Sequence, residues 1–214
     1  MNYKQKIFEA LEKNEKNQAV TWMQKAFSDG VSVIRFYEEI VSSIMNEIHC
    51  ESDDPSCIWK EHQMTAIMRS LIEISYTDLV KHKQCINPKK SVLIACPKDE
   101  THDLGALIGS HLFSYKGFKT TFLGADTPLS TLNEAIKYLN IDYLVISATN
   151  AFHLFEIKNM IETIKTTYPD IKVIGAGHAF KVAYSEFKHA PDYIMDSMDD
   201  IDTFIKREGL TCSP

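Results

Sequence analysis

Residues 91–105 read SVLIACPKDETHDLG, and this stretch decides the fold. It opens with an apolar run, Ser91–Cys96, that is typical of a strand buried on both faces of a sheet. A polar loop with Glu100 and His102 follows, and a helix is predicted over Leu104–Tyr115. In open parallel sheets, ligands bind beyond the carboxyl ends of the strands. If the strand belongs to such a sheet, this loop lies at the ligand-binding edge.

The same strand–loop–helix pattern repeats along the rest of the chain. Short apolar strands alternate with amphipathic helices, as in a parallel sheet that is covered on both faces. The predicted strands are Ser91–Cys96, Lys119–Leu123, Tyr143–Ser147, Lys172–Gly175 and Tyr193–Met195. The predicted helices are Leu104–Tyr115, Leu129–Leu139, Leu154–Thr167, Lys181–Phe187 and Ile201–Arg207. The pattern predicts an α/β fold over residues 90–214, with a doubly wound, flavodoxin-like, five-stranded parallel sheet.

Residues 1–85 differ, because they hold one proline and one glycine and show helical periodicity. The predicted helices are Tyr3–Asn14, Asn17–Phe27, Ser32–Ile48 and Ile58–Val80. Short connections between helices favour a small antiparallel four-helix bundle. The polar segment Lys81–Lys90 (KHKQCINPKK) is the predicted linker. We therefore expect a helical bundle over residues 1–85, followed by a Rossmann-like domain over residues 90–214.

The composition excludes several classes of protein. The 214 residues carry a net charge of −6, so we expect no direct binding to nucleic acid. No apolar run approaches the roughly 20 residues of a membrane span, and the charged N-terminus does not resemble a signal peptide. We expect a cytoplasmic protein without membrane contact. Five cysteines without paired spacing predict reduced thiols rather than a disulfide framework.

The usual ligands of a doubly wound domain leave signatures at the strand ends, and three of these are absent. The G-x-G-x-x-G pattern of a dinucleotide site does not follow the first strand, nor does the Ser/Thr-rich phosphate loop of a flavodoxin. A phosphoacceptor aspartate would end the third strand, where Ser147 stands. The strand ends instead carry E-x-H-x-x-G (Glu100, His102, Gly105), S-x-T (Ser147, Thr149) and a small-residue turn (Gly175, Gly177).

This three-part order resembles the cobalamin-binding domain of methionine synthase, of corrinoid methyl carriers and of light-sensing cobalamin-dependent MerR-type regulators. The resemblance covers about residues 90–187, and the helical part is similar to the bundle that caps the cofactor in these families. It implies a cobalamin cofactor (adenosylcobalamin, methylcobalamin or hydroxocobalamin) with His102 as a cobalt ligand. A neutral imidazole suits cobalt, and Glu100 or Asp103 is expected to orient its other ring nitrogen.

The resemblance also implies roles for the remaining motif residues. Gly105 would let the start of the helix lie close to the cofactor. Ser147 and Thr149 would hydrogen-bond along a slot that takes the dimethylbenzimidazole tail of cobalamin. Gly175 and Gly177 would let the nucleotide loop approach the backbone.

A further resemblance lies in the last helix of the bundle. Glu61-His62 is similar to the Glu-His pair of the light-sensing regulators, whose histidine can take the upper cobalt position. In a helix, His62 shares a face with Ile58, Thr65, Ala66 and Arg69, nearly opposite the apolar stripe of Met64, Ile67, Met68 and Leu71. We therefore expect His62 to face the cofactor as a second metal ligand. Trp59 is expected either to cover the upper face of the cobalamin or to lie in the core.

Three functional hypotheses follow. The leading one is a cobalamin-binding sensor or regulator that responds to light if it holds an alkylcobalamin. We expect it to lack the DNA-binding domain of the MerR-type regulators, so it would act through a protein partner such as a transcription factor, or as a homo-oligomer. The alternative is a corrinoid methyl-carrier subunit that works with a methyltransferase. The third is a degenerate domain that binds another tetrapyrrole or serves as an interaction module. No residue set predicts catalysis by the protein itself.

Overall fold

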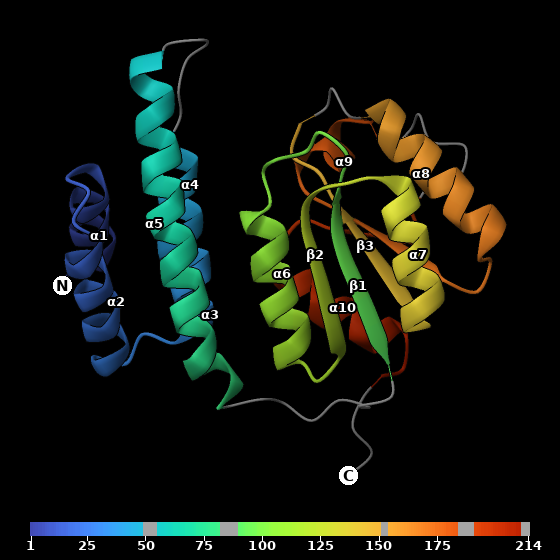
Figure 1. Ribbon diagram of the computed structural model, residues 1–214. Coiled ribbons are helices and arrows are strands. Elements are labelled where there is room, and N and C mark those ends of the chain that lie inside the picture. Colours follow the sequence, from blue (N-terminus) through green and yellow to red (C-terminus); the bar gives the residue numbers. More distant parts are fainter. Residues whose placement is uncertain (49–54, 82–89, 151–153, 184–190, 211–214) are drawn as a thin grey trace. The chain divides into compact units, whose positions relative to one another are not determined.

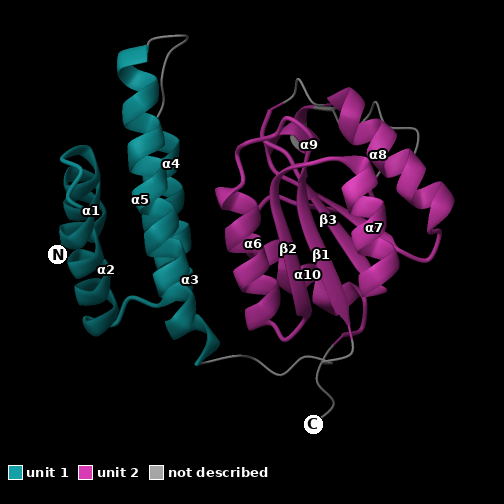
Figure 2. Cartoon of the chain, in the orientation of Figure 1, with its two compact units in different colours: residues 1–82 teal, residues 83–214 magenta. Residues whose placement is uncertain are grey.

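The computed structural model describes residues 1–48, 55–81, 90–150, 154–183 and 191–210. The chain divides into two compact units, Met1–His82 and Lys83–Pro214 (Figures 1 and 2). The boundary falls inside the predicted linker, Lys81–Lys90, most of which lies outside the described residues.

The first unit is built from helices, as predicted. They are α1 (Tyr3–Glu12), α2 (Lys16–Ser28), α3 (Val33–Arg35), the π-helix η1 (Phe36–Val41), α4 (Ser42–Glu47) and α5 (Pro55–Val80). Asn2 and Ser32 begin α1 and α3, because their side-chain oxygens accept hydrogen bonds from the N–H groups of Gln5 and Arg35. Apolar residues at helical spacing form the core of the unit, and they include the predicted stripe of α5 (Met64, Ile67, Met68, Leu71).

The predicted helix Ser32–Ile48 is wound as a π-helix in its middle. The N–H and the hydroxyl of Ser42 both bond to the carbonyl oxygen of Tyr37, the hydroxyl at 2.9 Å. The Tyr37 side chain is buried, and its hydroxyl lies 2.9 Å from the Ser75 hydroxyl of α5. The wider turn therefore accompanies a buried polar contact between two helices, which helical periodicity does not reveal.

The second unit is the predicted doubly wound α/β domain. Its parallel strands are β1 (Ser91–Pro97), β2 (Lys119–Thr127), β3 (Tyr143–Ser147), β4 (Lys172–Ala176) and β5 (Tyr193–Met195). They lie in the order β2-β1-β3-β4-β5, which is the flavodoxin-like order, so the predicted fold class is confirmed. The helices are α6 (Leu104–Tyr115), α7 (Leu129–Leu139), α8 (Leu154–Thr167), α9 (His178–Ala183) and α10 (Asp199–Arg207).

The two faces of this sheet have different cores. On one face, α7, α8 and α9 pack through a hydrophobic, mostly aliphatic cluster that includes Leu132, Ile157 and Phe180. On the other face, aromatic rings of α6 and α10 meet rings from the sheet, mostly edge to face, with centroids 5.0 to 6.2 Å apart. Because both faces are covered, the central strands are apolar throughout, as their sequences suggest.

In the second unit, two of the predicted boundaries that fall on described residues differ by three residues or more, and both lie at the carboxyl edge of the sheet. β2 extends to Thr127 instead of ending at Leu123, because an irregular pairing with β1 lets it continue past Gly124. α9 begins at His178, three residues before the predicted helix Lys181–Phe187. The part of that predicted helix beyond Ala183 lies outside the described residues.

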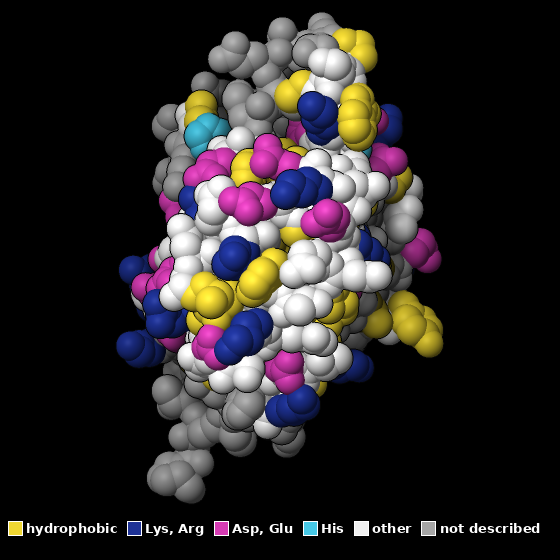
Figure 3. Space-filling view, turned by 90° about the vertical axis from the view of Figure 1, so that its left-hand side faces the viewer, with side chains coloured by type: hydrophobic (Ala, Val, Ile, Leu, Met, Phe, Trp, Pro, Cys, Tyr) yellow, Lys and Arg dark blue, Asp and Glu magenta, His cyan; other side chains and the backbone are white. Residues whose placement is uncertain are grey.

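The exterior of the helical unit is charged. Figure 3 shows Lys and Arg side chains interspersed with Asp and Glu on the side of the molecule where α1 and α2 lie. Charged side chains of the helical unit form ion pairs, as Lys25 does with Asp29 and Arg35 with Glu39. Among the described helices, none has the length and apolar character that would let it cross a membrane.

The cysteines depart from the prediction at one position. Cys57, near the start of α5, is disulfide-bonded, so the prediction of reduced thiols is wrong for this residue. Cys96 in β1 is a buried free thiol.

His111 in α6 makes the stability of the second unit depend on pH. The side chain is buried, and burial lowers the pKa of His111 to about 4. The unfolded chain binds the proton more readily than the folded chain. The stability that depends on neutral His111 is therefore fully present above pH 6.5 and is lost as the pH falls from 6.5 to 4. We predict that the free energy of unfolding of the protein falls by roughly 3 kcal/mol across this window relative to that of His111→Met. Chemical denaturation at several pH values measures it, and a pH-independent difference would contradict the prediction.

Candidate functional site

The loop between β1 and α6 is organised around one buried carboxylate. Glu100 is fully buried, and its oxygens accept four hydrogen bonds. Oε1 lies 2.9 Å from the backbone nitrogen of His102 and 2.7 Å from its Nδ1. Oε2 accepts from the N–H groups of Thr149 and Asn150, at 2.9 and 3.0 Å. Because β1 and β3 are neighbours, this one side chain joins the ends of two strands.

These contacts keep the carboxyl group ionised. Burial by itself would raise the pKa of Glu100, but hydrogen bonds from the His102 side chain and from the N–H groups of Asn150, His102 and Thr149 outweigh it and lower the pKa to about 2. An ionised carboxylate only accepts hydrogen bonds, so Nδ1 of His102 carries the proton. Nε2 is then the ring nitrogen that would offer its lone pair to a metal.

His102 projects from this support. Its side chain is 57% exposed, whereas that of Glu100 behind it is 0% exposed. The sequence leaves open whether Glu100 or Asp103 orients the ring, and in the structure Nδ1 donates its hydrogen bond to Glu100. Asp103 is buried and begins α6, where its carbonyl oxygen accepts from the N–H of Leu107. A carboxylate behind an imidazole is the usual support of a metal-binding histidine.

Gly105 lies in the first turn of α6 and faces open space. A Cβ at this position would meet no described atom within 4 Å, and the same holds for Gly109 one turn later. Packing among the described residues therefore does not require glycine at either position. The predicted role of Gly105 beside the cofactor stays a prediction.

The S-x-T motif lies at the same edge of the sheet as His102. Ser147 ends β3 and is buried, whereas Thr149 is exposed and donates its N–H to Glu100. The adjacent parallel strands β1 and β3 bring the two motifs together from about 50 positions apart in the sequence. Their predicted contact with a cofactor tail stays a prediction.

Gly175, inside β4, and Gly177, just after it, each have a packing role of their own. A Cβ on Gly175 would come 2.5 Å from the ring of Phe180, which fills the space beside the strand. Gly177 has φ +92, and a Cβ there would lie 2.4 Å from the carbonyl oxygen of Ala148. The close approach of this turn to the end of β3 explains Gly177 without a ligand. The predicted role of both glycines beside a nucleotide loop stays a prediction.

The predicted second ligand lies on the surface of the helical unit. His62 and Ala66 are exposed on α5, and Glu61 is half-buried. Trp59 is 57% exposed, so of the two expected positions the core is excluded. The face of α5 that carries His62 is thus not part of the core of its own unit.

Two contributors to the site have no signature in the sequence. Asn150 contributes through its backbone N–H, which any residue but proline could supply. Asp126 contacts the loop of Glu100 from the end of β2, through its own N–H and through its side chain. Their position directly after predicted strands is the signal that could have drawn attention to them.

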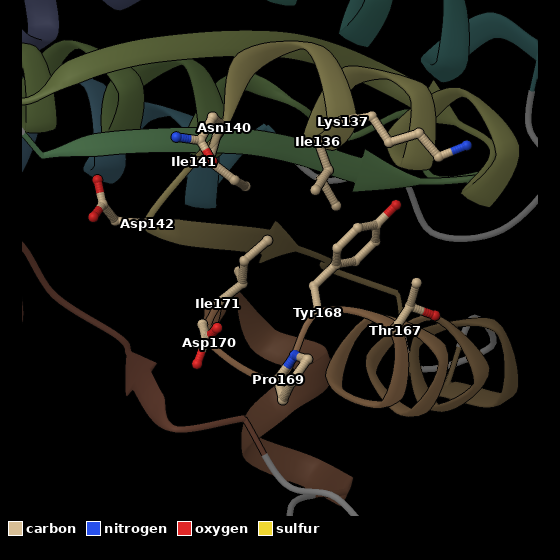
Figure 4. Close-up of a pocket in the computed structure, with 10 residues that line it drawn as sticks. All are labelled: Ile136, Lys137, Asn140, Ile141, Asp142, Thr167, Tyr168, Pro169, Asp170 and Ile171. Atoms are coloured by element: carbon tan, nitrogen blue, oxygen red, sulfur yellow. The ribbon is translucent and has the colours of Figure 1, made fainter.

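The described residues also form an open pocket of about 560 Å³ at the other end of the sheet (Figure 4). Its lining comes from the ends of α7 and α8 and the residues just before β3 and β4, and Ile136 and Ile171 point toward one another across it. Because it lies at the amino ends of the strands, this pocket is separate from the edge that carries His102.

The fold and the site together define a class of protein: a flavodoxin-like domain that presents one imidazole, backed by a buried carboxylate, at its ligand-binding edge. The donor fits cobalt in a corrin ring, because the macrocycle already supplies four nitrogens and an imidazole would supply a further one. The family profile of the B12 binding domain matches residues 90–200, just over half of the chain, and the chain belongs to this family. Its cofactor is therefore a corrinoid.

Individual relatives agree with this assignment. Over 118 residues, the chain is 30% identical to the HTH-type transcriptional repressor CarA of Myxococcus xanthus, and the matched stretch is 54% of this chain and 39% of that protein. The fold is similar to that of the Methanosarcina barkeri monomethylamine corrinoid protein, with a TM-score of 0.74 and 15% identity over 95% of this chain and 96% of the other. A cobalamin-binding protein from Desulfitobacterium hafniense DCB-2 has a TM-score of 0.50 and 14% identity over 94% and 96%.

Glu100→Ala tests the role of the buried carboxylate in folding. The substitution removes the acceptor of three backbone N–H groups and of His102 Nδ1, so we expect the free energy of unfolding to fall by about 2–4 kcal/mol. Glu134→Ala is the matched control, because Glu134 is an exposed glutamate paired with Lys137 and should change stability by about 0.5 kcal/mol or less. Equal effects of the two substitutions in chemical denaturation would contradict this role.

Gly177→Ala tests the close approach of the β4 turn to β3. Gly124 is the control, because it has a similar φ of +88 but no atom within 4 Å of an added Cβ. Both alanine variants suffer from the positive φ, and Gly177→Ala should lose about 1–3 kcal/mol more through its clash with Ala148. Equal losses in the free energy of unfolding would show that the clash is relieved.

Proposed function

We propose that this protein is a cobalamin-dependent regulator in which His102 is the lower ligand of cobalt and His62 a ligand for its upper face. The observation that carries the proposal is the exposure of His62 on α5, beside the small side chain of Ala66 and opposite the buried stripe. An exposed imidazole beside a small residue suits a flat macrocycle. The match to the transcriptional repressor CarA supports a regulatory role.

His102 would bind cobalt through Nε2. The ionised Glu100 holds the proton on Nδ1, so Nε2 would be the ring nitrogen that binds cobalt. The same hydrogen bond limits rotation of the ring, so less conformational freedom is lost on binding. Gly105 would leave room for the corrin, and Ser147, Thr149, Gly175 and Gly177 would line the path of its tail.

The upper face would be completed by the helical unit. His62 would bind the metal when no alkyl group occupies that position, with Glu61 beside it and the exposed Trp59 covering the ring. When it carries an alkyl group, cobalamin supplies a cobalt–carbon bond that light can break. The contacts of α5 would then differ between the two cofactor states, and a protein partner such as a transcription factor, or a second copy of the chain, would read the difference.

A corrinoid methyl carrier is the second candidate. It is favoured by the extent of the fold similarity to the monomethylamine corrinoid protein, which covers 95% of this chain. The partner would then be a methyltransferase, and the upper face would stay open for methyl transfer. His62 would be dispensable in that case, which separates the two candidates.

Reconstitution with adenosylcobalamin, methylcobalamin and hydroxocobalamin in the dark tests the proposal. We expect His102→Ala to weaken hydroxocobalamin binding by about tenfold or more and to remove imidazole coordination from the absorbance spectrum. We expect His62→Ala to bind alkylcobalamins like the unmodified protein, but to lose the change in spectrum and oligomeric state that follows illumination.

Two variants serve as controls for these measurements. Glu134→Ala alters an exposed residue of the second unit on α7, and Thr77→Ala alters an exposed residue further along α5. Both should behave as the unmodified protein. A His62→Ala protein identical to the unmodified protein under illumination would contradict the regulator and favour the methyl carrier, and absence of corrinoid binding would contradict both.

A further inference from the structure

The end of β2 is irregular where it passes the loop of His102. Ile94 of β1 pairs with Phe122, but Ala95 pairs with Gly124 and Pro97 with Thr127. β2 therefore carries one extra residue before Gly124 and another after it. Such bulges bend a strand and re-aim its side chains, and they occur preferentially beside functional sites.

The second irregularity turns Asp126 toward the loop between β1 and α6. Its N–H donates to the carbonyl oxygen of Glu100 at 3.0 Å, and its Oδ1 accepts from the N–H of Asp99 at 2.9 Å. Both aspartates have left-handed backbone, with φ +48 at Asp126 and +65 at Asp99. This conformation is unfavourable for residues other than glycine and persists only where surrounding contacts hold it.

The backbone and the side chain of Glu100 are thus held from opposite sides. Asp126 holds the main chain at residues 99 and 100 from β2, while Thr149 and Asn150 hold the carboxylate from the end of β3. The carboxylate in turn holds the ring of His102. The direction of the imidazole therefore depends on both strands that flank β1.

We propose that Asp126 is a positioning residue for His102, acting through Asp99 and Glu100 without touching the imidazole. This inference rests on the proposed function, in which His102 binds cobalt. Removal of the Asp126 carboxylate would release the backbone at Asp99 and widen the range of directions of the ring. The affinity for a corrinoid would fall although the ligand and its carboxylate partner are intact.

Three variants separate the hydrogen bond from the backbone strain. Asp126→Gly removes the acceptor and accepts the positive φ, whereas Asp126→Asn retains an acceptor oxygen and a tolerance for this φ. Asn140→Gly is the matched control, because Asn140 has the same φ of +48 at the end of α7, at the other end of the sheet. Thermal unfolding of each variant verifies that it is folded.

Two measurements read out the effect. Nitrogen NMR of the histidine rings in the cofactor-free protein reports whether Nδ1 of His102 keeps its proton. We expect mixed tautomers in Asp126→Gly and the Nδ1–H form in the other proteins. Titration with hydroxocobalamin should show binding about threefold to tenfold weaker for Asp126→Gly, with a smaller fraction of imidazole-coordinated cobalt, and unchanged binding for Asp126→Asn and Asn140→Gly.

Several results would overturn the inference. These are an Asp126→Gly protein with normal tautomer and affinity, equal losses in Asp126→Gly and Asn140→Gly, or an Asp126→Asn protein as impaired as Asp126→Gly. If Asp126→Gly does not fold, hydrogen exchange of the unmodified protein tests the contact between Asp126 and Asp99. The amide of Asp99 should be protected, and exchange at the rate of a free peptide would contradict the contact. If the unmodified protein binds no corrinoid, the proposed function fails, while the tautomer and exchange measurements still judge the role of Asp126.

Discussion

A carboxylate buried away from water is stable only when its charge is met by hydrogen-bond donors, and Glu100 is in that position. Its four donors come from the loop after β1 and from the backbone after β3, so the requirement to satisfy one charge determines how two strand ends meet. The same requirement determines which nitrogen of His102 holds the proton. In the proposed function, folding and metal binding would be linked, because the contact that stabilises the loop would also prepare Nε2 as a ligand.

The rest of the carboxyl edge is arranged to permit this contact. Gly177 allows the turn after β4 to come against Ala148, immediately before the two N–H groups that reach Glu100. Parallel pairing of β1, β3 and β4 in consecutive order places the three motifs side by side. On the opposite side of β1 from β3, the bulged end of β2 brings Asp126 to the loop. The loop that carries the imidazole is thus contacted from the ends of β2 and β3, and the turn after β4 packs against the end of β3, because the carboxyl ends of parallel strands meet at one edge of a sheet.

The sequence predicts the parts of this arrangement that follow from periodicity and from motif order. Alternating apolar strands and amphipathic helices are enough to obtain the doubly wound fold, and E-x-H-x-x-G is enough to select His102 and its loop. The π-helix at Phe36–Val41 is not predictable in this way, because it accompanies a tertiary contact between Tyr37 and Ser75, and periodicity carries no information about such contacts. Backbone donors such as the N–H of Asn150 cannot be predicted from the sequence either, because almost every residue type has the same N–H group. The space beside Gly175 is filled by Phe180, which shows that a glycine in a motif can serve packing as well as a ligand.

Electron paramagnetic resonance of the cobalt(II) form tests the central claim most directly, because the unpaired electron couples to the nucleus of an axial nitrogen. The measurement compares protein with ordinary histidine, protein with ¹⁵N-labelled histidine and His102→Ala, each reconstituted with unlabelled cobalamin. Binding through Nε2 of His102 predicts a splitting that changes from the ¹⁴N to the ¹⁵N pattern on labelling and is lost in His102→Ala. A splitting that stays that of ¹⁴N in the labelled protein, as from the dimethylbenzimidazole of cobalamin, would contradict it.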